Sequence, residues 1–266
     1  MDILTNNDGC FLYKYLPYNH YSLQILINKE LWLGPPDMLN DPFEGEFIIK
    51  NYKNFQNDSF IEALLKAQWA NSIYYEILYS ENHTLFKSDD KAFLNCLYEY
   101  LNACIRRKFG TTSFSKKYDK MSMWSHYADS HKGFVIVFDR EKLERKIDYD
   151  TKLVDVSYNG FPEIEIDFFE DKITYGGKKL LTSKLPEWLE EEETRFIREN
   201  DFESIIPRFL SFEKDCILGI ILGSRLAYEN AKTLIQIKRS SFNDIVMITS
   251  NKNKARNSLE FEPLKI

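Results

Sequence analysis

Runs of apolar residues and their spacing divide this chain into strands and helices. Alternating or continuous apolar runs predict strands, whereas apolar residues three to four positions apart predict helices. The predicted strands are residues 11–15, 30–34, 111–115, 134–139, 153–158, 216–223, 245–250 and 259–263. The predicted helices are residues 21–29, 59–79, 90–108 and 227–238, with a polar break at residues 80–84. Turn-favouring residues 40–44 (NDPFE) follow the second strand.

The order of these elements predicts an α+β fold with a mixed or antiparallel central sheet. Helices gather between residues 59 and 108 and strands flank them, so regular strand–helix alternation is missing. The chain of 266 residues is within the size that one core serves, and neither a repeat nor a linker divides it. We therefore expect one domain over residues 1–266. Its helical segment 59–108 is expected between strands of one sheet and packed on that sheet.

The first concentration of polar chemistry is residues 123–134, MWSHYADSHKGF, which run into an apolar strand. It holds His126 and His131, two of four histidines, together with Trp124 and Tyr127. One interpretation is a pocket wall in which His126 or Tyr127 faces a ligand. In the other, His126 is a core histidine and His131 lies in a surface turn. A metal site is not predicted, because the spacing offers no third ligand.

The second concentration is residues 185–196, LPEWLEEEETRF, with five glutamates in seven positions. As a strand, this segment would place Glu191, Glu193 and Arg195 on one face. As a helix, it would place Trp188 beside Glu191. Carboxylates in a confined site serve as bases or stabilise a cation. The alternative is a solvated acidic face, which is the usual meaning of a charge run.

The two polar motifs lead to expectations for individual side chains. Trp188 is expected to be buried and Glu190 exposed, because tryptophan covers apolar surface and an unpaired glutamate stays in water. Glu193, His126 and Arg195 are expected to converge on one concave site, with the carboxylate held charged by the guanidinium. In a catalytic site, Glu193→Gln would abolish activity and leave the melting temperature nearly unchanged.

Two strands add further candidates. The strand 111–115 (TTSFS) carries small hydroxyl residues, including Ser113, which suit a sheet beside a bound ligand. Alternation in the first strand places Tyr13 on one face and Lys14 on the other. An inward Lys14 needs a carboxylate, for which Glu44 is a candidate, and an ordinary surface lysine is the alternative.

Charge and cysteine usage narrow the classes of protein. The formal charge of −6, from 35 basic and 41 acidic residues, argues against a nonspecific DNA-binding protein, though not against contact with one nucleotide or a tRNA end. No run approaches the ~20 apolar residues of a membrane span, and the N-terminus lacks a signal-peptide layout. Four scattered cysteines without CxxC spacing are expected to be reduced thiols. We therefore expect a cytoplasmic protein without a membrane segment.

Several of these segments, in this order, resemble a large bacterial family of uncharacterised domains, catalogued as domain of unknown function 2971. The resemblance covers most of residues 11–225, through LYKY, YSLQIL, ELWLGPPDMLNDPFE, TSFS, MWSHYADSHKGFVIVFD, VSYNG, WLEEEETR and IILGSR. MWSHYADSHKG is quite specific. The resemblance implies no stated activity, but it implies a setting among accessory genes of phage-defence and mobile-element regions.

The chain also resembles ADP-ribosyltransferases, which use NAD as substrate. Their sites combine a basic or aromatic residue on an early strand, a Ser-Thr-Ser-like strand and a late glutamate, often in Glu-x-Glu. Tyr13 or Lys14, then Ser113, then Glu191 and Glu193 fall in that order. The first position departs from the pattern, because the usual Arg or His is missing. Splitting the nicotinamide–ribose bond develops oxocarbenium character, which a carboxylate stabilises.

The resemblance to ADP-ribosyltransferases implies a defence or toxin-type effector that transfers ADP-ribose from NAD or cleaves NAD. Glu193 would be the catalytic carboxylate, Glu191 would help to position the acceptor, and His126 would complete the catalytic pocket. The side chains that would bind the substrate are Tyr13, Lys14, Ser113, Trp124, Tyr127 and Arg195.

Other classes of function remain open on the sequence. A nonenzymatic sensor or antitoxin-like binding module would use His126 and Arg195 to bind a ligand or partner. A nuclease or another hydrolase is a third class, although a paired acidic-and-lysine motif is missing. The expected partner is a nucleotide-type small molecule, and a protein or nucleic-acid target and an oligomeric state are left open.

Overall fold

The computed structural model describes residues 9–39, 41, 43, 45–69, 72, 75–145, 151–169, 172–175, 177–199, 208–242, 244–253, 255 and 258–264. Residues 40, 42 and 44 of the predicted NDPFE loop lie outside the described residues. The expected pairing of Lys14 with Glu44 therefore falls outside them as well.

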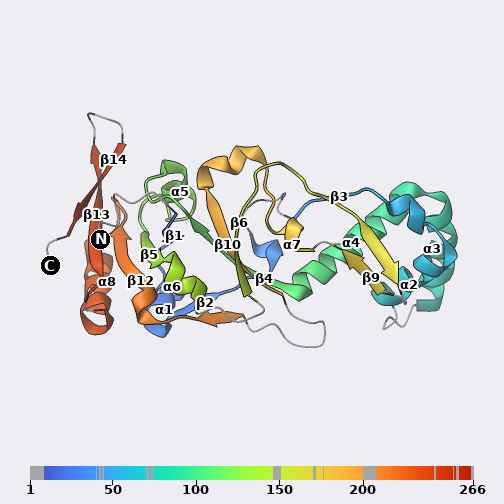
Figure 1. Ribbon diagram of the computed structural model, residues 1–266, viewed down its shortest axis with the longest axis horizontal. Coiled ribbons are helices and arrows are strands. Elements are labelled where there is room, and N and C mark those ends of the chain that lie inside the picture. Colours follow the sequence, from blue (N-terminus) through green and yellow to red (C-terminus); the bar gives the residue numbers. More distant parts are fainter. Residues whose placement is uncertain are drawn as a thin grey trace.

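One large sheet runs through the molecule (Figure 1). Its strands are β1 (Phe11–Leu16), β4 (Phe109–Ser115), β5 (Phe134–Asp139), β6 (Thr151–Asp155), β10 (Glu193–Glu199), β12 (Ile217–Leu222), β13 (Val246–Asn253) and β14 (Ser258–Pro263). They lie in the order β14-β13-β12-β5-β1-β4-β10-β6. Neighbours are antiparallel except β12 and β13, which are parallel and joined by α8 (Tyr228–Ser241). The sheet is mixed, so the predicted α+β class is confirmed.

Shorter elements surround this sheet. Three two-stranded pairs are β2 (Glu30–Trp32) with β11 (Phe209–Ser211), β3 (Ile48–Ile49) with β7 (Glu163–Ile164), and β8 (Ile166–Phe169) with β9 (Lys172–Tyr175). The other helices are α1 (His20–Asn28), α2 (Asp58–Trp69), α3 (Tyr75–Ser88), α4 (Asp90–Lys108), α5 (Met121–His126), α6 (Arg140–Arg145) and α7 (Gly177–Leu180). The 3-10 turns are η1 (Pro36–Met38), η2 (Tyr52–Phe55), η3 (Pro186–Glu191) and η4 (Lys214–Cys216).

Two predicted boundaries are wrong. Residues 80–84, expected as a polar break, lie inside α3, where the Asn82 amide donates to the carbonyl oxygen of Leu78 (2.8 Å). Polar residues on a solvated helix face do not end a helix, and the break falls instead between α2 and α3. The strand expected at residues 153–158 is displaced to β6, because that is the stretch that pairs with β10.

The two faces of the sheet are covered differently. Leu12 of β1 and Phe114 of β4 point into a core shared with Leu26 of α1 and with α8. Tyr15 alternates with these residues and points to the opposite face, where its ring meets Trp124 of α5 edge-on. We call this second face the α5 face. The alternation in β1 therefore puts its tyrosines on the face without the long helices.

The helical segment of α2, α3 and α4 lies at the end of the molecule opposite the β13–β14 hairpin (Figure 1). Leu97 and Leu101 of α4 share a buried cluster with Phe109 of β4 and Ile197 of β10. The helical segment therefore shares a core with the sheet, as expected, but packs at its end rather than across its face.

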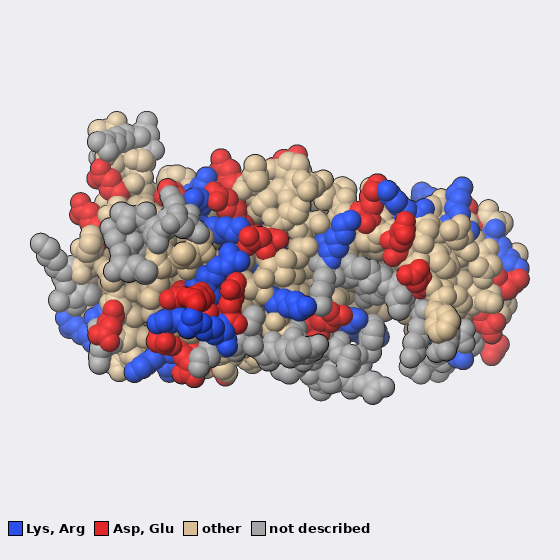
Figure 2. Space-filling view, in the orientation of Figure 1, with Lys and Arg blue, Asp and Glu red and all other residues tan. Residues whose placement is uncertain are grey.

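Charged side chains of both signs are interspersed over the face shown in Figure 2. Ion pairs at partly exposed positions include Lys116 with Asp155 (2.7 Å) and Arg140 with Glu144 (3.0 Å). A uniform basic surface, as nonspecific DNA binding needs, is not what this face presents. Among the described helices, none is both long and apolar enough to cross a membrane.

Candidate functional site

The acidic motif adopts two structures in succession rather than one helix or one strand. Pro186–Glu191 form the turn η3, Glu192 takes a left-handed backbone with φ 43°, and Glu193 begins β10. Left-handed backbone is uncommon outside glycine and reverses the chain locally. The motif therefore delivers Glu191 from a turn and Glu193 from a strand.

Four charged side chains meet where η3 joins β10. They form what we call the buried ion cluster: Lys184, Glu191, Glu193 and Arg195, each at most 6% exposed. Lys184 Nζ donates to Oε2 of Glu191 (2.6 Å) and to Oε2 of Glu193 (3.1 Å). Arg195 donates from Nε and Nη2 to the two oxygens of Glu193 (2.7 and 2.9 Å). Two cations thus balance two carboxylates out of contact with water.

The cluster keeps Glu193 ionised. Burial raises the pKa of this carboxyl, but the charge and hydrogen bonds of Arg195 and the charge of Lys184 outweigh burial and lower it to about 2. The expected pairing of Glu193 with Arg195 is therefore confirmed. Arg195 also donates from Nη1 to the carbonyl oxygen of Leu181 (2.7 Å), which fixes the guanidinium plane.

Glu191 connects the two polar motifs. Its Oε1 accepts from the Tyr127 hydroxyl (2.7 Å), and its Oε2 accepts from Lys184. Sequence reasoning missed Lys184, which sits between both carboxylates and lies 4.9 Å from the ring centre of Trp188. The one indication of Lys184 in the sequence was electrostatic. Two neighbouring carboxylates that are both buried need more positive charge than Arg195 supplies.

The outer side of the site is aromatic. Trp188 is half-buried and Glu190 exposed, so the expected order of their exposures is confirmed. The ring of His126 lies 6.4 Å from that of Trp188 and 6.4 Å from that of Tyr127, and His126 is exposed. His126 therefore stands on the surface beside the buried ion cluster, behind two aromatic rings, rather than within it.

The other histidine of the motif, His131, is buried, whereas His126 is exposed. His131 is 8% exposed and stacks on Trp124, with ring centres 6.0 Å apart and planes 7° apart. Trp124 is fully buried and donates from Nε1 to the carbonyl oxygen of Tyr118 (2.8 Å). The structure therefore places Trp124 in the core instead of on a pocket wall. It buries His131 and exposes His126, the reverse of the alternative in which His126 is a core histidine and His131 lies in a surface turn.

The burial of His131 predicts a pH dependence of stability. Burial, and then the charges of Lys252 and Arg225, lower the pKa of His131 below its ordinary 6.5. The folded state holds the neutral imidazole. Its contribution to the free energy of unfolding is therefore present above the pKa of the unfolded chain and is lost as pH falls below that value. The free energy of unfolding should drop as pH falls below about 6.5, the ordinary histidine value. His131→Phe should flatten that drop, and an unchanged slope in the variant would contradict the assignment.

Two of the candidates from the early strands share a face with Glu193. Ser115 of β4 lies opposite Tyr13 of β1 and opposite Glu193 of β10. Ser113 of β4 lies opposite Arg195 of β10. Directly opposed residues point to the same side of a sheet, so Tyr13, Ser113 and Glu193 all lie on the α5 face. The hydroxyl of Ser113 is buried beside the Glu193 carboxyl and helps to lower its pKa. These three side chains span three neighbouring strands.

Lys14 lies on the opposite face from Glu193. Its Nζ donates to the Thr112 hydroxyl (2.8 Å) and to the carbonyl oxygen of Ser113 (3.1 Å), and it lies 5.2 Å from the ring centre of Phe114. Burial lowers the pKa of Lys14 to about 8, against the opposing attraction of Glu193. Strand alternation thus excludes Lys14 from the α5 face, and Tyr13 takes the first-strand position there.

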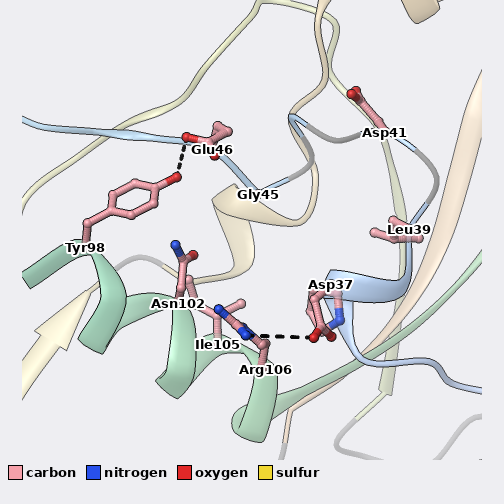
Figure 3. Close-up of a pocket in the computed structure, with 10 residues that line it drawn as sticks. Asp37, Leu39, Asp41, Gly45, Glu46, Tyr98, Asn102, Ile105 and Arg106 are labelled. Carbon is pink, nitrogen blue, oxygen red and sulfur yellow. Dashed lines mark hydrogen bonds and ion pairs between the residues drawn. The ribbon is translucent and has the colours of Figure 1, made fainter. Parts of the chain in front are cut away.

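A separate cavity of about 220 Å³ lies between α4 and the segment around η1 (Figure 3). In the close-up, the Tyr98 hydroxyl donates to Glu46, and Arg106 pairs with Asp37 at 3.9 Å. The cavity is lined by Pro36, Asp37, Leu39, Asp41, Gly45, Glu46, Tyr98, Asn102, Ile105 and Arg106. None of the residues predicted for the site belongs to this lining.

Comparisons with known proteins cover the two polar motifs. Residues 123–196, which contain both polar motifs in full, match the model of a family described as a protein of unknown function, DUF2971. No curated protein matches the chain, and no solved structure matches it. Within the described residues, no group of three or more His, Cys, Asp and Glu side chains is placed to hold a metal ion. The family match thus joins Tyr127, Glu191 and Glu193 in one segment and supports the resemblance to domain of unknown function 2971.

Proposed function

We propose that this chain binds NAD on the α5 face and breaks its nicotinamide–ribose bond, passing ADP-ribose to an acceptor or to water. The observation that carries the proposal is the placement of Tyr13, Ser113 and Glu193 on one face of β1, β4 and β10. The family resemblance adds the setting, a defence or toxin-type effector. The order of Tyr13, Ser113 and Glu193 along the chain suggested that they form one site. The pairing of the strands puts all three on the same face of the sheet.

The electrostatics suit that bond cleavage. As the bond between ribose C1′ and the nicotinamide nitrogen breaks, its electron pair neutralises the pyridinium and positive charge develops on the ribose. Glu193 is ionised, so it stabilises that charge and does not act as a proton donor. An acceptor oxygen or water then bonds to C1′ and releases its proton. Arg195 and Lys184 give Glu193 three hydrogen bonds, and an ionised carboxylate accepts about four, which leaves room for a ribose hydroxyl.

Access to Glu193 needs a movement of η3. Glu193 is 4% exposed, and η3 carries both Glu191, bonded to Lys184, and Trp188, whose ring lies over that lysine. NAD therefore reaches the carboxylate only when this turn shifts outward. Trp188 and Tyr127 are then the aromatic surfaces nearest to the nicotinamide ring.

Ser113→Ala tests the proposal while leaving the four charges of the buried ion cluster in place. The serine hydroxyl lies beside Glu193, whose charge Arg195 and Lys184 already hold, so its removal should change the melting temperature little. Nicotinamide release from NAD, followed by chromatography, should fall by about tenfold or more if this hydroxyl orients substrate beside Glu193.

The matched control is Thr111→Val. Thr111 also has a buried hydroxyl on the same face of β4, but it lies opposite Ile197, one pair further from Glu193. This variant should keep the wild-type rate. Equal rates in both variants, or no nicotinamide release by the wild type, would remove the support for catalysis.

The internal pairing of the cluster favours one rival, a binding module. Both carboxylates are paired with cations inside the protein, and Glu191 also accepts from Tyr127, so the cluster needs no ligand to balance its charges. The same assay separates the two classes. A binding module raises its melting temperature with NAD and releases no nicotinamide, whereas the enzyme does both.

A further inference from the structure

A second polar site lies at the carboxyl ends of the parallel strands β12 and β13 (Figure 1). There the turn after β12 meets the segment between α5 and β5. Gly223 N donates to the carbonyl oxygen of Gly133 (3.0 Å), and Arg225 N donates to that of His131 (3.0 Å). A Cβ at Gly223 would lie 2.3 Å from the carbonyl oxygen of His131. The turn after β12 is therefore locked against the turn that carries His131. Carboxyl ends of parallel strands are frequent places for ligands.

Two polar atoms in this contact lack partners. His131 Nδ1 and the Ser224 hydroxyl are both buried and have no hydrogen-bond partner within the described part of the chain. Leaving a buried polar atom unpaired costs about 1–3 kcal/mol. Native proteins tolerate few such atoms, and each one points to a ligand, an ion or water that completes it. Here two occur in turns that bond to each other.

Positive charge surrounds these atoms. Arg225 follows Ser224 directly, and Lys252 lies in β13, three residues beyond Thr249, which pairs with Leu222 at the end of β12. Both cations are exposed, and the guanidinium of Arg225 donates to the carbonyl oxygen of Ser130 (3.3 Å). Their charges also act on His131, whose pKa they help to lower. The acidic side chain nearest in sequence to His131 is Asp129, and it is paired with Lys132 at 3.9 Å.

We propose that His131, Ser224, Arg225 and Lys252 bind a phosphate group, carried by a nucleotide or another small phosphoester. A phosphate dianion matches the two cations in charge, and guanidinium hydrogen bonds suit its oxygens. The Ser224 hydroxyl and the imidazole supply the neutral donors that such a group also uses. β12 lies four strands from β10, about 19 Å across the sheet, so this site is separate from the Glu193 carboxylate of the proposed NAD site.

Titration with inorganic phosphate and, separately, with AMP tests the site at constant ionic strength. Affinity would be measured by calorimetry on wild type, Arg225→Ala, Lys252→Ala, Ser224→Ala and Lys66→Ala. Lys66 is an exposed lysine of α2, at the other end of the molecule, and is the charge-matched control. We expect Arg225→Ala and Lys252→Ala to weaken binding about tenfold or more each, a change of about 1.4 kcal/mol. Ser224→Ala should weaken it while keeping the melting temperature, and Lys66→Ala should leave it unchanged.

The outcomes distinguish the source of the phosphate and the two proposals. Tighter binding of AMP than of inorganic phosphate identifies a nucleotide, and equal binding identifies the free anion. The site is overturned if Arg225→Ala, Lys252→Ala and Lys66→Ala bind equally well, or if the wild type binds neither probe more tightly than about 10 mM. Ser113→Ala should leave phosphate affinity unchanged, so failure of the NAD proposal leaves this result standing.

Discussion

Glu193→Gln is expected to destabilise the protein by about 3 kcal/mol or more in chemical unfolding at neutral pH. The neutral amide leaves the fully buried guanidinium of Arg195 without the charge of Glu193, and Lys184 loses one of two carboxylate partners. Breaking a buried pair on one side costs more than the pair itself contributes, because the remaining charge stays out of water. This burial revises the expectation that the same substitution would leave the melting temperature nearly unchanged.

The effect of Glu193→Gln should depend on pH. The pKa of Glu193 is lowered from 4.5 to about 2, so its stabilisation is fully present above the unfolded value. It is lost as pH falls from about 4.5 through about 2, because the unfolded chain then binds the proton more readily. Wild type should lose about 3 kcal/mol over this window from this group alone. The variant should lack that part of the slope.

Two comparisons make this test specific. Glu190→Gln, at an exposed position three residues away, should change the free energy of unfolding by less than about 0.5 kcal/mol. The double variant Glu193→Leu with Arg195→Met should recover much of the loss, because it removes both charges and keeps apolar volume. A Glu193→Gln protein as stable as wild type would mean that the carboxylate is not held by the cluster described above.

Gly133→Ala is expected to cost at least about 3 kcal/mol or to prevent folding. A Cβ at this position would lie 2.0 Å from the carbonyl oxygen of Leu16 and 3.0 Å from that of Ala128. Both atoms are backbone, and Gly133 N donates to the same Ala128 oxygen (2.8 Å), so relief requires moving a strand or breaking that bond. Expression yield and urea unfolding measure the effect.

Gly223→Ala should behave in the same way. Its Cβ would lie 2.3 Å from the carbonyl oxygen of His131 and 2.6 Å from that of Gly133. Because the carbonyl oxygen of Gly133 is one of the atoms that a Cβ at Gly223 would meet, the two sites are in contact, and the double variant should lose less than the sum of the single losses. The neighbouring exposed residue supplies the control, since Lys132→Ala should change stability by less than about 0.5 kcal/mol. Losses below about 1 kcal/mol for both glycine variants would show that the turns can separate without cost.

Much of the fold could be predicted from local pattern. Continuous apolar runs indicated β5, β12 and β13, and helical spacing indicated α1, α4 and α8. The sequence also identified the two segments in which polar and titratable residues are concentrated, and the contact of Tyr127 with Glu191 joins these segments. The facing of Trp188 and Glu190 also followed, because a large ring and an unpaired charge have opposite preferences for water.

The sequence by itself determined most strands of the large sheet, the helices α1, α4 and α8, the sign of the overall charge and the segments that hold the polar residues. Only the tertiary structure decided which histidine is buried, that Lys14 and Glu193 lie on opposite faces, and that Lys184 completes the ion cluster. The physical reason is that period and propensity act over a few residues. The partner of a buried charge instead depends on which strands pair, and that pairing joins residues far apart in the chain: β1 with β4, β4 with β10, and the turn at Gly223 with the turn at His131.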